Sequence, residues 1–222
     1  MIMDFAMTEA ELTGALTDLF AGAVAIPLIV ILIKTDAQKH KEKKHWVSFF
    51  VCLCVSFLVG FAAHYLIRSG LGQKITWVFL YFLLIETTSL FALLGICIYT
   101  KEKKPDPKLL KIFHSILLPF WLAVVIPETF FGKNMIIPCV AVCSVLGVFG
   151  FILILLSLIK HGEKSLLLPL LSVVLLLPAA FIQLKHDSFI HVVFDFDHNG
   201  IAHLLIAAAV IVLFLGARKR IK

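Results

Sequence analysis

The sequence has few charged residues and no cysteine arrangement that would indicate disulfide bonds. Only 15% of its 222 residues are charged, whereas 61% are hydrophobic and 20 are phenylalanines. A soluble domain is about 45–50% apolar and about 25% charged, so the composition excludes a soluble globular fold. Apolar runs long enough to cross a bilayer, about 20 residues each, recur along the whole chain. The composition therefore predicts an integral membrane protein that crosses the membrane several times.

The cysteines all lie within apolar runs, where buried thiols behave as small hydrophobic groups. They are Cys52, Cys54, Cys97, Cys139 and Cys143. We therefore expect neither a disulfide framework nor a redox motif. The N-terminal segment is acidic and lacks the basic start of a signal peptide, so the first apolar run is expected to be retained. No internal repeat stands out, which indicates one domain over residues 1–222.

Seven spans are predicted, and the basic residues orient them. The spans are roughly 13–33, 47–67, 75–99, 109–127, 135–159, 165–184 and 199–217. Most lysines and arginines fall in the first, third and fifth connections and in the C-terminal tail, all on one side of the membrane. The positive-inside rule then predicts an all-α seven-helix bundle with its N-terminus outside and its C-terminus in the cytosol. This distribution accounts for the net charge of +6 without nucleic acid, in a bacterial inner membrane or a eukaryotic internal or plasma membrane.

Ionisable residues within apolar spans are costly and therefore mark candidate functional sites. Asp18, His64, Glu86 and His203 lie within predicted spans, and Glu128 lies at the end of the fourth. At a rise of about 1.5 Å per residue, all but Glu86 fall in the outer third of the membrane, and Glu86 falls near its middle. The sequence thus predicts a polar site that is open to the outside and built from several helices.

Two imidazoles with one or two carboxylates are ligands that Zn²⁺ accepts. A water on such an ion becomes a nucleophile near neutral pH, and Glu86 or Asp18 is the candidate general base. The same residues are also the groups of a proton or ion relay. A third alternative is that they merely bridge helices in a structural subunit.

The stretch FDFDHNGIAH, residues 194–203, begins like a calcium-binding EF-hand loop. The closing glutamate of such a loop is replaced by Ile206, so the calcium interpretation fails. The acidic residues are typical of a helix cap. Asn199 and His203 are four residues apart and share a helical face, whereas His198 joins them only from a non-helical position.

The pattern resembles the superfamily of alkaline ceramidases and adiponectin-receptor-like proteins, which are seven-helix zinc amidohydrolases. That family carries Ser-x-x-x-His on its second helix, an acidic residue on its third and His-x-x-x-His on its seventh. The matching positions here are Gly60 to His64, Glu86, and Asn199 to His203. Gly60 replaces the serine, with Ser56 one turn away, and Asn199 replaces a histidine, with His198 beside it.

The resemblance implies a zinc-dependent hydrolase acting on a membrane lipid or lipid amide. It implies His64, His198 and His203 as the metal ligands, Glu86 and Asp18 as catalytic residues, and Asn199 and Ser56 as their supports. The alternative is a transporter or sensor that uses the same Asp, His and Glu side chains as a proton or ion relay. A retinal protein is excluded because the seventh span contains no lysine for a Schiff base.

Overall fold

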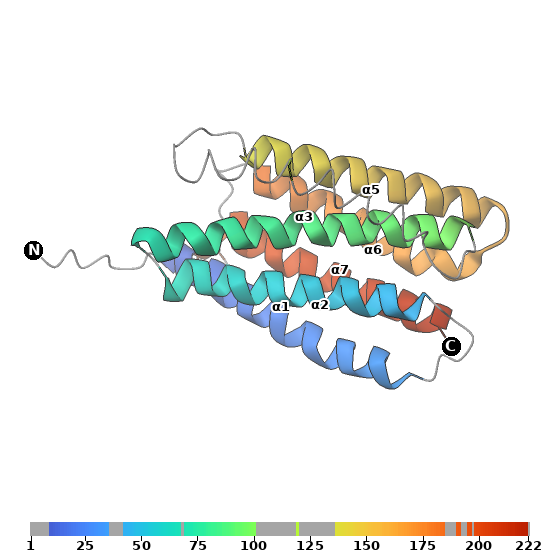
Figure 1. Ribbon diagram of the computed structural model, residues 1–222, viewed down its shortest axis with the longest axis horizontal. Coiled ribbons are helices and arrows are strands. Elements are labelled where there is room, and N and C mark those ends of the chain that lie inside the picture. Colours follow the sequence, from blue (N-terminus) through green and yellow to red (C-terminus); the bar gives the residue numbers. More distant parts are fainter. Residues whose placement is uncertain are drawn as a thin grey trace, which may run out of the picture.

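The protein is an all-α bundle whose long helices lie side by side along one axis (Figure 1). The computed structural model describes residues 9–35, 42–67, 69–100, 119, 136–184, 190–191, 195–196 and 198–221. The α-helices in this part of the chain are α1 (Glu9–Lys34), α2 (Lys43–Phe61), α3 (Gly70–Thr100), α5 (Ile136–Lys160), α6 (Leu167–Leu184) and α7 (His198–Ile221).

Shorter elements extend or connect these helices. The π-helical turn η1 (Ala62–Leu66) continues α2, and the 3-10 turn η2 (Lys164–Leu166) leads into α6. The strands β1 (Ile190–His191) and β2 (Asp195–Phe196) pair in antiparallel fashion just before α7.

The described helices agree with the predicted spans to within a few residues at each end. Five of them are long and apolar enough to cross a membrane, namely α1, α2 with its π-helical extension, α3, α6 with its 3-10 turn, and α7. In α5 the apolar stretch found among the described side chains is Val148–Lys160. The predicted span 109–127 and Glu128 lie outside the described residues. The helix lengths and composition are those of an integral membrane protein that crosses the membrane more than once.

Aromatic rings connect the helices in the buried core. Phe91 of α3 packs against Phe49 of α2 at 5.1 Å between ring centroids and against Phe151 of α5 at 4.1 Å. Phe50 of α2 meets Phe214 of α7 edge to face at 6.3 Å. These contacts join four helices, because phenylalanine rings bury a large apolar area in specific geometries.

The outer surface is apolar, whereas several polar side chains are buried. Phe149, Phe181 and Leu66 are 58%, 60% and 62% exposed, as expected for side chains that face lipid. The buried polar residues are Thr13, Thr17, Asp18, Ser56, Thr87, Ser89, Ser172 and His203. Since polar groups are costly in hydrocarbon, these buried residues are the places to look for a site.

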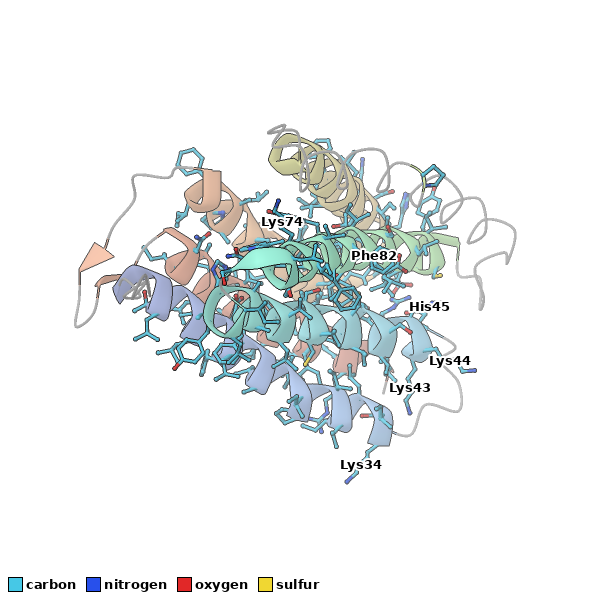
Figure 2. All side chains as sticks on the ribbon, turned by 60° about the vertical axis from the view of Figure 1, so that its left-hand side comes forward. Lys34, Lys43, Lys44, His45, Lys74 and Phe82 are labelled. Atoms are coloured by element: carbon cyan, nitrogen blue, oxygen red, sulfur yellow. The ribbon has the colours of Figure 1, made fainter. Side chains whose placement is uncertain are left out.

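Basic residues gather at one end of the bundle. The end where α1, α5 and α7 finish and where α2 and α6 begin carries Lys34, Lys43, Lys44, Lys160, Lys164, Arg218, Lys219 and Arg220. Figure 2 shows Lys34, Lys43 and Lys44 close together and Lys74 apart from them. In this part of the chain, Arg220 forms a two-pronged ion pair with Glu42, with nitrogen–oxygen distances of 2.7 and 2.9 Å.

Candidate functional site

A buried contact between an aspartate and a histidine joins the first and last helices of the bundle. Oδ1 of Asp18 on α1 lies 3.2 Å from Nδ1 of His203 on α7, and the two side chains are only 5% and 11% exposed. This is hydrogen-bonding distance, and the partners are a carboxyl group and an imidazole. The pair lies at the end of the bundle opposite the basic cluster, near the starts of α1 and α7.

Thr17 helps to determine where the proton lies in this pair. Its hydroxyl donates to the carbonyl oxygen of Gly14 at 2.8 Å, which leaves its oxygen to accept a hydrogen bond. That oxygen is 3.4 Å from His203 Nδ1. Because an ionised Asp18 also only accepts, a proton on Nδ1 satisfies both neighbours. The geometry therefore favours the Nδ1–H form of His203 when Asp18 is ionised.

Gly60 of α2 brings a third helix against the pair. A Cβ atom built at Gly60 would lie 2.6 Å from Oδ2 of Asp18 and 3.1 Å from its Cγ. A serine at this position, as the ceramidase-like pattern has it, would therefore collide with the carboxyl group. The absence of a side chain at position 60 is what lets Asp18 lie against α2.

His64, which we predicted as a metal ligand, packs on α3. Its ring meets Trp77 edge to face, with centroids 5.0 Å apart and planes at 86°. His64 lies in the π-helical turn, in which the Ile67 amide donates to the Ala62 carbonyl oxygen at 2.8 Å. The predicted role of His64 as a metal ligand stays a prediction.

Glu86 and Ser56 lie with Cys52 and Thr87 where α2 meets α3. Thr87, next to Glu86 in the middle of α3, lies with its hydroxyl 3.2 Å from the Cys52 sulfur. Ser56 is buried, and its hydroxyl donates to the Cys52 carbonyl oxygen at 2.9 Å. Ser56 therefore bonds within its own helix, and its predicted role as a support for a metal site stays a prediction.

The other predicted residues lie at the start of α7. Helix α7 begins at His198, so the backbone of this residue is helical, while its side chain lies outside the described residues. Asn199 is half-buried one full turn before His203, which places the two on one helical face. The capping interpretation of the acidic stretch agrees with a helix that starts here.

A zinc site needs several suitable side chains close together. Among the side chains that the structure describes, no group of three or more His, Cys, Asp or Glu residues is placed to hold a metal ion. A catalytic zinc site uses three protein ligands, and the Asp18–His203 pair supplies two donors. The described residues alone therefore do not complete a zinc site, and the zinc-binding role of His198 stays a prediction.

Sequence reasoning placed Asp18 and His203 at one depth, and the structure brings them into contact. It missed Thr17, which could have been noticed as the hydroxyl beside Asp18. Gly60 was identified as the residue in place of the serine, but its contact with Asp18 was not predicted.

Comparison with known proteins identifies a family whose function is unknown. The model of a family of unknown function, DUF6962, matches residues 13–222. A search of curated proteins and a search of solved structures each found no match.

Proposed function

Since the chain belongs to the DUF6962 family of unknown function, we propose a role from the site itself: proton binding by Asp18 and His203, in a membrane transporter or sensor. The observation that supports this proposal is the buried contact of 3.2 Å between Asp18 Oδ1 and His203 Nδ1. Intramembrane carboxyl and imidazole groups are the usual elements of proton relays. The imidazole changes its charge near neutral pH, so a modest change in its surroundings loads or unloads the proton.

The pair can hold one proton between two buried groups with little net charge. Loss of that proton leaves a negative charge in an apolar environment, which is unfavourable unless water or a cation enters. Because Asp18 and His203 lie on different helices, we propose that deprotonation loosens the contact between α1 and α7. Such coupling between a proton and a helix arrangement is what a proton-linked transporter or a pH sensor requires.

The proposed topology has seven spans with the N-terminus outside and the C-terminus in the cytosol. In Figure 1, α3 ends at the basic end of the bundle and α5 begins at the opposite end. One further crossing between residues 100 and 136 would connect them and bring the number of spans to seven. The basic residues at the ends of α1, α5 and α7 and at the starts of α2 and α6 lie at the end that this topology places in the cytosol. The Asp18–His203 pair would then lie near the outer surface.

Vesicles that contain the purified full-length protein and a trapped pH dye test this function. After a proton gradient is imposed, the unchanged protein is expected to dissipate it faster than Asp18→Asn and His203→Gln. The control is His161→Gln, which removes an exposed histidine in the turn after α5. A pH-dependent change in helix contacts without proton flux would indicate a sensor. Identical behaviour of all variants in both measurements would contradict the proposal.

A zinc-dependent lipid hydrolase is the second candidate, and one feature of the pair favours it. Histidines that bind metals usually donate their other ring N–H to a carboxylate, and His203 Nδ1 lies 3.2 Å from Asp18 Oδ1. The ligands would be His203, His64 and His198. Metal analysis of the purified protein tests this candidate, together with His203→Ala and His198→Ala. Well under one zinc per chain in the unchanged protein would contradict it.

A further inference from the structure

Gly60 is the point at which α2 approaches the Asp18–His203 pair. It is buried in the last turn of α2 before the π-helical segment. A Cβ atom there would lie 2.6 Å from Asp18 Oδ2, 3.1 Å from Cγ and 3.4 Å from Oδ1. All three of these nearest atoms belong to one carboxyl group. The space that the glycine leaves open is therefore occupied by the group that contacts His203.

We infer that Gly60 is a positioning residue, which holds the Asp18 carboxyl group against His203 and thereby sets the proton affinity of the pair. The carboxyl group lies between two helices, with Oδ1 toward His203 on α7 and Oδ2 toward the α2 backbone. A methyl group at position 60 would displace it, because Oδ2 cannot remain 2.6 Å, nor Cγ 3.1 Å, from a Cβ atom. This inference rests on the proposed function, since it concerns how the same pair holds its proton.

A second tightly packed glycine, Gly22, allows this role to be distinguished from ordinary helix packing. Gly22 lies in the same α1–α2 interface, where a Cβ would meet the Leu58 Cδ2 atom at 2.9 Å. That contact is with the end of a flexible apolar side chain, so Gly22→Ala perturbs the packing of these helices without touching the carboxyl group. Gly22→Ala is therefore the matched control.

The elements packed on α7 carry several titratable residues. Helix α6 has none between Leu167 and Ile182. Helix α1 has Asp18, with Glu9 and Glu11 at its start, and β2 has Asp195. On the α2 side, His64 packs on Trp77 of α3. Since Asp18 Oδ1 lies 3.2 Å from the imidazole, its displacement is expected to change the proton affinity of His203.

The experiment is a pH titration of His203 by NMR, using the full-length protein with ¹⁵N-labelled histidine in lipid nanodiscs. The His203 signal is assigned from its loss in His203→Gln. An adjacent carboxylate favours the protonated imidazole, so Asp18→Asn is expected to lower the proton affinity of His203 by about tenfold or more. Gly60→Ala is expected to lower it by about tenfold as well, whereas Gly22→Ala leaves it unchanged. In the Asp18→Asn background, Gly60→Ala should add no further change, because the two act through one group.

Two results would overturn the inference. One is a Gly60→Ala titration that matches the unchanged protein. The other is a shift from Gly60→Ala that persists in Asp18→Asn. If Asp18→Asn itself does not alter the titration of His203, the proposed function fails first. If Gly60→Ala does not fold, Asp18→Ala supplies the missing space: recovery of folded protein in the double variant supports the contact, and no recovery contradicts it.

Discussion

At the scale of single residues, small side chains decide how closely the helices approach one another. Gly216 of α7 lies against Pro169 of α6, and a Cβ atom there would overlap the proline ring and lie 3.0 Å from the Pro169 nitrogen. About two turns earlier in α7, the Ala209 carbonyl oxygen accepts a hydrogen bond of 2.8 Å from Ser172 of α6. Close backbone approach and interhelical hydrogen bonds are the usual means of helix association in membranes.

We predict that Gly216→Ala destabilises the protein, since the methyl group has no room beside a rigid proline ring. Overpacking of this kind costs about 1–3 kcal/mol in free energy of unfolding. Thermal unfolding in detergent, followed by circular dichroism, measures the effect. Gly150→Ala in α5 is the control, because a Cβ there meets nothing within 4 Å. Equal stability of the two variants would show that α6 and α7 are not packed this closely.

At the scale of elements, an ion pair joins helix ends that are far apart in the sequence. Arg220 near the end of α7 contacts Glu42, the residue before α2, through two nitrogen–oxygen contacts, and both side chains are largely buried. Glu163, between α5 and α6, lies 3.8 Å from the same guanidinium group and is 40% exposed. Two-pronged pairs of arginine and carboxylate are stronger than single contacts, so the Glu42 contact should carry most of the stabilisation.

Glu42→Gln is therefore predicted to lower the free energy of unfolding by about 1.5–3 kcal/mol. Glu163→Gln, which removes a longer and more exposed contact, is predicted to cost less than about 1 kcal/mol. Chemical denaturation of both variants in the same detergent gives the comparison. The prediction is wrong if the two variants lose the same stability.

At the scale of the whole molecule, the distribution of charge indicates how the bundle lies in the membrane. The described lysines and arginines at the ends of α1, α5 and α7 and at the starts of α2 and α6 face one side, and the Asp18–His203 pair lies toward the other. Positive residues are retained on the cytosolic side during insertion.

Cysteine labelling in intact cells measures this orientation. In a variant whose native cysteines are replaced by serine, Thr8→Cys is expected to react with a membrane-impermeant maleimide from outside. Lys222→Cys is expected to react only after the membrane is permeabilised, because the seven spans that we propose would place the two ends on opposite sides. Labelling of both positions from the same side would require an even number of spans.

The membrane class, the approximate span boundaries and the candidate polar residues follow from the sequence alone. The reason is that apolar runs and costly intramembrane charges are local properties, readable without knowing which helices touch. Asp18 and His203 were placed at one depth because the helical rise is fixed.

The tertiary structure decided which of these residues meet. His64 lies in a π-helical turn and meets Trp77 of α3, a contact between helices that the sequence pattern does not show. The role of Gly60 is visible only once α1 lies against α2, because Gly60 leaves space for the Asp18 carboxyl group. That group contacts His203, which lies 185 residues later in the chain. Local sequence patterns thus specified the helices and their depth, and long-range packing specified the pair.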